Sequence, residues 1–180
     1  MAPKPIIICG SSASGKSTVA DLVFRQLELT GERPSAGDLF RRIADEQGMT
    51  LSALRERANE DPSIDIAIDR RMLGPARRGE VSVVDGRVLA WLAHREQLAA
   101  HKVLLTVSPI EAAARLASRE KIGLEMARRQ IYRRDLEDAE RLGRLYGWIP
   151  DDTSYYDQVI HSESYRPKVI ADMIVPAASR

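Results

Sequence analysis

The 180-residue sequence predicts an α/β fold in which a five-stranded parallel sheet is flanked by helices. Short apolar runs alternate along the chain with longer segments whose apolar residues recur every three or four positions. The connections are short, which favours parallel strands joined by helical crossovers. A glycine-rich loop follows the first apolar run, and ligands of such sheets bind beyond the carboxyl ends of the strands.

Four of the expected strands are short, mainly apolar runs, and the segment 32–36 is a weaker candidate. The strands are expected at 6–9, 32–36, 81–85, 103–107 and 159–161. Helices are expected at 16–28, 37–47, 51–59, 63–78, 109–119, 125–145 and 166–175. Helix starts are indicated by Thr50 and Ser63 as N-caps and by Pro109 after Ser108.

The composition is that of one ordinary folded domain spanning 1–180. The formal net charge of +1 argues against a nucleic-acid or membrane partner. Cys9 is the single cysteine, which excludes an internal disulfide and a cysteine-based zinc cluster. No apolar stretch reaches 18 residues and no signal peptide precedes the first strand, so we expect a cytoplasmic protein.

The glycine-rich loop reads Gly-Ser-Ser-Ala-Ser-Gly-Lys-Ser and fits the pattern of a phosphate-binding loop between a strand and a helix. In such a loop the backbone N–H groups surround a polyphosphate, Lys16 reaches the β- and γ-phosphates, and Ser17 binds Mg²⁺. The alternative is a glycine turn without a ligand. The nucleotide-binding residues expected here are Gly10, Ser11, Ser12, Ala13, Ser14, Gly15, Lys16, Ser17 and Thr18.

Two further segments follow expected strands and carry charged residues. After the second strand come Ser35, Gly37 and Arg41, and the arginine would grip a phosphate one turn into a helix. A helix start with a solvated arginine is the alternative. After the third strand come Asp85, a candidate Mg²⁺ ligand, and Arg87, although a plain turn also explains Asp-Gly.

A long expected helix places three charged residues, Arg134, Asp138 and Arg141, on one face. The stretch before and around them is rich in arginine and is expected to fold over ATP phosphates. Solvated surface ion pairs would look similar. The arginines considered for this arm are Arg115, Arg119, Arg128 and Arg129. Asp65 and Asp69, four residues apart on another helix, either shape the acceptor pocket or form a salt-bridged face.

These segments together resemble the archaeal-type cytidylate kinases, a family of P-loop nucleoside monophosphate kinases. The resemblance rests on the segments GSSASGKST, SAGDLFRRIADEQGM, NEDPSIDIAIDRRM, VVDGRVLAWLA, RRDLEDAERLGRLYG and YYDQVIHSES. It implies helices at 37–79 that bind the acceptor nucleotide and an arginine-rich lid at 115–135. It also implies ATP and Mg²⁺ as cofactors, CMP and dCMP as acceptors, and a monomer.

The resemblance also assigns roles. Together with the motifs above, it makes Lys16, Arg134, Asp138 and Arg141 the expected catalytic residues. The expected acceptor-binding residues are Ser35, Gly37, Arg41, Asp85, Arg87, Arg134, Asp138 and Arg141, and the expected metal ligands remain Ser17 and Asp85. Ala36 stands where adenylate kinases and bacterial cytidylate kinases carry a hydroxyl residue, which leaves the selection of the base open. A P-loop kinase with another acceptor, namely UMP, AMP or a small hydroxylated metabolite, is the alternative. A P-loop regulator without enzymatic activity is the alternative from another class.

Overall fold

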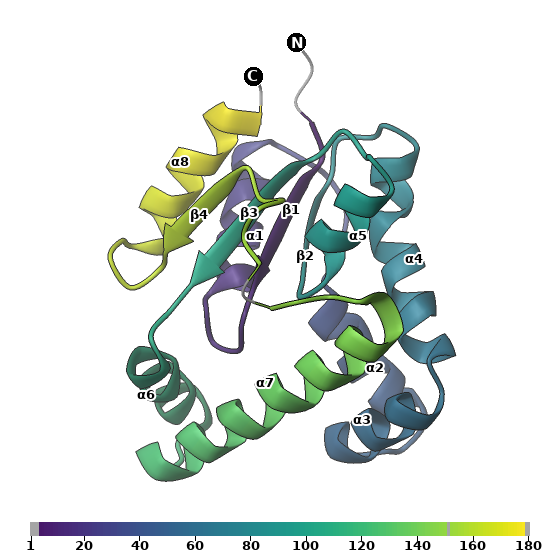
Figure 1. Ribbon diagram of the computed structural model, residues 1–180. Coiled ribbons are helices and arrows are strands. Elements are labelled where there is room, and N and C mark those ends of the chain that lie inside the picture. Colours follow the sequence, from purple (N-terminus) through teal and green to yellow (C-terminus); the bar gives the residue numbers. More distant parts are fainter. Residues whose placement is uncertain (1–3, 151, 179–180) are drawn as a thin grey trace.

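The computed structural model describes residues 4–150 and 152–178. In this part of the chain four parallel strands form one sheet (Figure 1). Their order is β2–β1–β3–β4, with β1 at Ile6–Gly10, β2 at Val83–Gly86, β3 at His101–Thr106 and β4 at Gln158–His161. The non-sequential order is the expected result of helical crossovers between parallel strands.

The prediction of a fifth strand at 32–36 is wrong. This segment has one isolated parallel bridge, between Ser35 and Asp85, and it lies beside β2 where a fifth strand would stand. Pro34 lacks an N–H group and cannot donate to a ladder of hydrogen bonds, and helix α2 begins at Ala36. The segment therefore touches the sheet without extending it.

Eight helices surround the sheet in the described residues. They are α1 (Lys16–Gln26), α2 (Ala36–Glu46), α3 (Leu51–Glu60), α4 (Ser63–Arg77), α5 (Leu89–Arg95), α6 (Pro109–Glu120), α7 (Leu124–Tyr146) and α8 (Pro167–Ala178). Helix α5 was not predicted. Its residues 89, 90, 92 and 93 are all buried, so it lacks the one-sided apolar spacing that marks a helix in a sequence.

Helix starts agree with the predicted caps at two of three positions. The hydroxyls of Thr50 and Ser108 accept the backbone N–H groups at the starts of α3 and α6. Ser63 is not an N-cap, because it is the first residue of α4. The carboxylate of Asp61 accepts the Ser63 N–H instead, at 3.0 Å.

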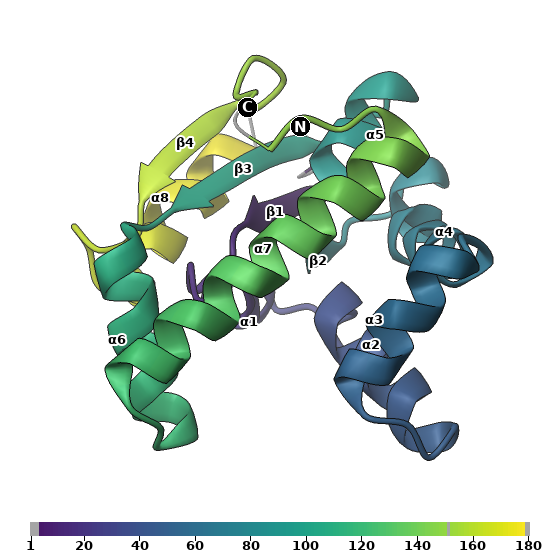
Figure 2. The same cartoon turned by 60° about the horizontal axis from the view of Figure 1, so that its bottom comes forward.

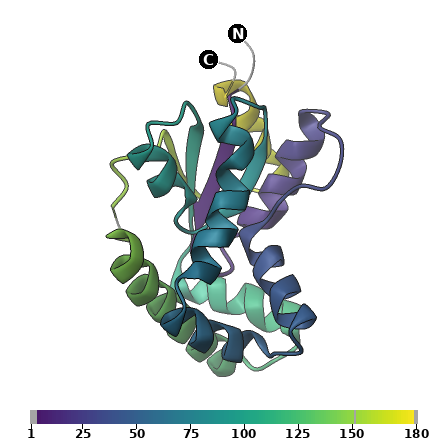
Figure 3. The ribbon, with the colours of Figure 1, turned by 90° about the vertical axis from the view of Figure 1, so that its right-hand side faces the viewer.

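The core lies on both faces of the sheet, because alternate residues of β1 point to opposite sides. Ile6 and Ile8 pack with residues of α1 and α8, whereas Ile7 and Cys9 pack with residues of α4 and α5. Figure 3 shows this layering from the side. Cys9 is fully buried, and burial raises the pKa of its thiol to about 11.

The remaining helices gather at the carboxyl ends of the strands (Figures 1 and 2). Helix α7 crosses this edge, with α6 packed against its first half and with α2 and α3 facing its second half. Two of its buried side chains are charged, namely Asp138 and Arg141. This edge is therefore the place for a polar site. No helix within 4–150 and 152–178 combines the length and apolar character that a membrane span requires.

Candidate active site

The loop after β1 is tightly curled at the amino end of α1. Ala13 and Gly15 both have positive φ angles, of 58° and 86°. A Cβ on Gly10 would lie 2.5 Å from Ser14 Oγ and 2.6 Å from the Leu105 carbonyl oxygen, so only glycine fits there. A curled backbone that leads into a helix amino end favours an anion.

Lys16 lies where this loop meets a cleft between the helices. Its Nζ donates a hydrogen bond to the Ser11 carbonyl oxygen at 3.0 Å. Burial, together with the nearby Arg87 and Arg134, lowers the pKa of Lys16 to about 8. Ser14 Oγ in the same loop is buried without a hydrogen-bond partner among the described residues. The side chain of Thr18 faces outward, since that residue is exposed.

Ser17 and Asp85 meet below the loop. Ser17 Oγ donates to Asp85 Oδ2 at 2.8 Å. Arg33, which the sequence did not single out, pairs with Asp85 Oδ1 and, at 2.6 Å, with Asp21. Burial opposes the charge of Arg33, but Asp85 raises its pKa above the usual value. A hydroxyl and a carboxylate are oxygen ligands of the kind that Mg²⁺ prefers, so this pair fits a magnesium ion.

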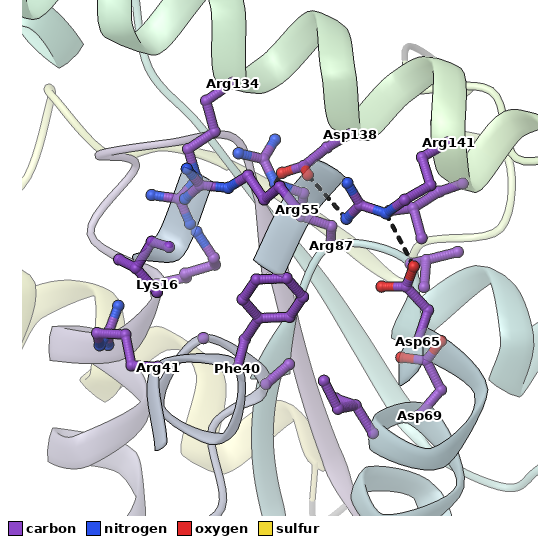
Figure 4. Close-up of a pocket in the computed structure, with 17 residues that line it drawn as sticks. Lys16, Phe40, Arg41, Arg55, Asp65, Asp69, Arg87, Arg134, Asp138 and Arg141 are labelled. Carbon is purple, nitrogen blue, oxygen red and sulfur yellow. Dashed lines mark hydrogen bonds and ion pairs between the residues drawn. The ribbon is translucent and has the colours of Figure 1, made fainter. Parts of the chain in front are cut away.

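A cleft opens beside the loop, between α2, α3, α4 and α7 (Figure 4). Cationic side chains outnumber carboxylates on its walls. The charged lining residues are Lys16, Arg41, Arg55, Arg87, Arg134, Arg141, Asp65, Asp69 and Asp138. The apolar lining comes from Ala36, Phe40, Leu51, Ile68, Val88 and Leu142. Such a surplus of positive charge around a hollow favours an anionic ligand.

Two arginines of α7 carry donors without partners. Arg134 Nε and Arg141 Nη1 are buried, and neither has a hydrogen-bond acceptor among the described residues. Burial, with the nearby Arg87 and Arg55, lowers the pKa of Arg134 to about 10. Buried donors without partners cost free energy, so both atoms fit a ligand that supplies acceptors.

Arg141 is held by two carboxylates. Its Nε donates to Asp65 Oδ2 at 2.8 Å, and its Nη2 donates to Asp138 Oδ1 at 2.9 Å. Burial opposes ionisation of Asp138, but Arg87 and Arg141 bring its pKa below the usual value. These ion pairs fix the guanidinium and leave its third nitrogen, Nη1, without an acceptor among the described residues.

Arg87 joins the loop to α7. Its Nη2 donates to Ser12 Oγ at 2.7 Å and to Asp135 Oδ1 at 2.6 Å, and its Nε lies 2.6 Å from Asp138 Oδ2. The backbone N–H of Ser12 also donates to Asp135, at 3.3 Å. The sequence did not identify Asp135, although this carboxylate directly contacts the loop.

The segment after Pro34 reaches the cleft only in part. Gly37 and Arg41 line the cleft, and Arg41 forms an ion pair with Asp38 while its side chain stays half-exposed. Ser35 is buried and lies outside the lining, where its hydroxyl caps α2 by accepting the Asp38 N–H at 3.4 Å.

The four arginines considered for the arm formed by α6 and α7 differ in where their side chains lie. Arg115 points inward and donates to Ser162 Oγ at 2.9 Å and to the Ala13 carbonyl oxygen at 3.4 Å. Arg119, Arg128 and Arg129 are exposed. Arg115 therefore connects the arm to the loop and to the segment that follows β4.

The sequence did not identify one further residue of the cleft, and it left the role of a pair of aspartates undecided. Arg55 lies on α3 opposite α7, and no motif surrounds it in the sequence. Asp65 and Asp69, considered above only as alternatives, line the cleft and are buried. Their spacing of one helical turn was the available signal.

Comparison of the sequence with known proteins shows which protein family this chain belongs to. A family model described as an AAA domain matches residues 6–142. The cytidylate kinase of Ignicoccus hospitalis is 36% identical over 169 residues, covering 94% of this chain and 95% of the relative. That of Halobacterium salinarum is 32% identical, covering 96% of this chain and 88% of the relative.

Solved structures agree with the fold. An uncharacterized protein from Eubacterium ventriosum has a TM-score of 0.70 at 16% identity, covering 98% of this chain and 99% of that one. Shikimate kinase from Bacteroides thetaiotaomicron has a TM-score of 0.57 at 15% identity, covering 98% and 96%. These likenesses establish the fold alone. The sequence relatives go further, and by their identity and coverage this chain belongs to the cytidylate kinase family.

Proposed function

We propose that the protein transfers the γ-phosphoryl group of ATP to CMP, and also to dCMP, giving ADP and the nucleoside diphosphate. The observation that carries the proposal is the pair of buried, unpartnered donors on Arg134 and Arg141, in the cleft that Lys16 also lines. In a member of the cytidylate kinase family, this arrangement suits two phosphate groups that meet end to end.

The chemistry needs no catalytic base from the protein. A phosphate oxygen of CMP forms the new bond to the γ-phosphorus as the bond from that phosphorus to the bridging oxygen of ATP breaks, and ADP leaves. The second pKa of a phosphate monoester is about 6, so the attacking oxygen is already ionised at neutral pH. The difficulty is the repulsion between two polyanions.

The cations of the cleft offset that repulsion. Lys16 would contact the β- and γ-phosphates, and Arg134 Nε would donate to the transferring group. Arg41 would bind the acceptor phosphate from α2, and Arg87 would hold the loop against α7 through Ser12. Fixed donors of this kind act without reorganisation during the reaction.

Ser17 and Asp85 would hold Mg²⁺, since their oxygens already lie together beneath the loop. When bound, the ion supplies neutralisation of phosphate charge. The arm of α6 and α7 would close over ATP as a lid in the region 115–135, excluding water that could otherwise accept the phosphoryl group. From the sequence, we propose that the enzyme acts as a cytoplasmic monomer.

A coupled assay of ADP release tests the proposal, with CMP, dCMP, UMP, AMP and simple polyols as acceptors. CMP and dCMP should support turnover, and Lys16→Ala should abolish it. Lys168→Ala is the matched control, because Lys168 lies exposed on α8, where it forms an ion pair with Asp172. ATP binding without acceptor-dependent turnover, or wild-type activity in Lys16→Ala, would contradict the assignment.

A further inference from the structure

One end of the cleft is acidic and lies apart from Lys16. Asp65 and Asp69 lie one turn apart on α4, and they are only 7% and 8% exposed. In Figure 4 they stand on one side of Phe40, whereas Lys16 and Arg41 stand on the other. A nucleotide with its phosphate at Lys16 would therefore place its base toward the two carboxylates.

The two carboxylates differ in their partners. Asp65 is paired with a cation, because its Oδ2 accepts from Arg141 Nε. Asp69 forms no ion pair within the described part of the chain, and its Oδ2 accepts a hydrogen bond from the neutral Tyr146 hydroxyl at 2.6 Å. The nearby Arg77 is already engaged in a double hydrogen bond with Glu96.

A buried carboxylate without a cation is costly to the fold. Burial, opposed by the Tyr146 hydrogen bond and reinforced by Asp65, raises the pKa of Asp69 to about 7. A purely structural role would be served as well by a neutral side chain at this position. The Tyr146 hydroxyl holds Oδ2, which leaves Oδ1 as an acceptor in the cleft that Asp69 lines.

We propose that Asp69, held in place by Tyr146, accepts a hydrogen bond from the 4-amino group of cytosine and so selects cytosine over uracil. The inference rests on the proposed CMP kinase function and adds the residue that reads the base. An ionised carboxylate only accepts hydrogen bonds, and the 4-amino group of cytosine donates them.

Uracil would be rejected at the same position. It carries an oxygen in place of the amino group, and this acceptor would face the acceptor Oδ1 of Asp69. The walls beside it are apolar, formed by Phe40, Ile68 and Leu142. Little water can enter there, so two facing acceptors would stay without a hydrogen-bond donor. This lowers the affinity for UMP relative to CMP.

The test compares kcat/KM for CMP and UMP in the full-length wild type and in Asp69→Asn at pH 8. The amide offers an N–H to the uracil oxygen, so the preference for CMP should fall about tenfold or more. Asp45→Asn is the matched control, since Asp45 lies exposed on α2 away from the cleft. An unchanged ratio in Asp69→Asn, with CMP turnover intact in the wild type, would overturn the inference and leave the function standing.

A second measurement needs no variant. Calorimetric titration of the wild type compares CMP with the ribonucleotide of pyrimidin-2-one, which lacks only the 4-amino group. We expect about tenfold weaker binding of the analogue. Equal binding of the two ligands would refute the inference, whereas absence of CMP binding and CMP turnover would refute the proposed function itself.

Discussion

Replacing Asp69 by Asn is expected to stabilise the folded protein at neutral and alkaline pH. Burial raises the pKa of Asp69 from 3.8 to about 7, so the folded state holds this proton more tightly than the unfolded chain does. Stability is therefore lost as the pH rises above 3.8, and the loss is complete above about 7. At roughly 1.4 kcal/mol per pKa unit, ionisation costs about 4 kcal/mol at pH 8 and about 2 kcal/mol at pH 5.

Asparagine avoids this cost because it has the shape of the acid, never ionises, and can still accept from Tyr146. Urea unfolding followed by circular dichroism, without nucleotide, gives the free energy of unfolding at pH 5 and pH 8. The advantage of Asp69→Asn over the wild type should grow by about 2 kcal/mol between these pH values. Asp45→Asn, an exposed control, should show no such growth. An advantage that stays constant with pH would refute the reasoning about Asp69.

Three further outcomes follow from the site. Since burial lowers the pKa of Lys16 to about 8, kcat/KM for ATP should fall as the pH rises through that value, and a flat profile up to pH 9.5 would count against its role. Arg41→Ala should raise the KM for CMP about tenfold with the KM for ATP unchanged, as steady-state kinetics can show. Arg33→Ala should lower the free energy of unfolding by about 3 kcal/mol, because it leaves Asp85 buried without its cation. Arg42→Ala, which breaks an exposed pair with Glu32, should cost less than about 1 kcal/mol in the same urea titration.

Structural features that depend on residues close together in the sequence could be predicted. The loop at 10–17 has its strand, its helix and its turn glycines side by side in the chain, so its place was evident. The spacing of Arg134, Asp138 and Arg141 likewise put them on one face of α7, two of them buried. Local periodicity is sufficient for such elements.

Features that depend on distant partners could not be predicted. Arg33 contacts Asp85 across 52 residues, and Asp135 contacts Ser12 across 123. Neither Arg33 nor Asp135 lies in a sequence motif from which its distant partner could be inferred. The strand expected at 32–36 was a weak candidate, and Pro34 within it lacks the N–H group that a ladder of hydrogen bonds needs.

The single thiol of the chain provides an intrinsic probe of the central strand. Cys9 is inaccessible in β1 and burial raises its pKa to about 11, so a disulfide reagent can reach it only when the elements that cover this face of the sheet open. The rate of labelling then reports how often the core around Cys9, next to the loop, opens. Any ligand that holds this loop closed should slow the labelling, which gives a binding assay without an added fluorophore.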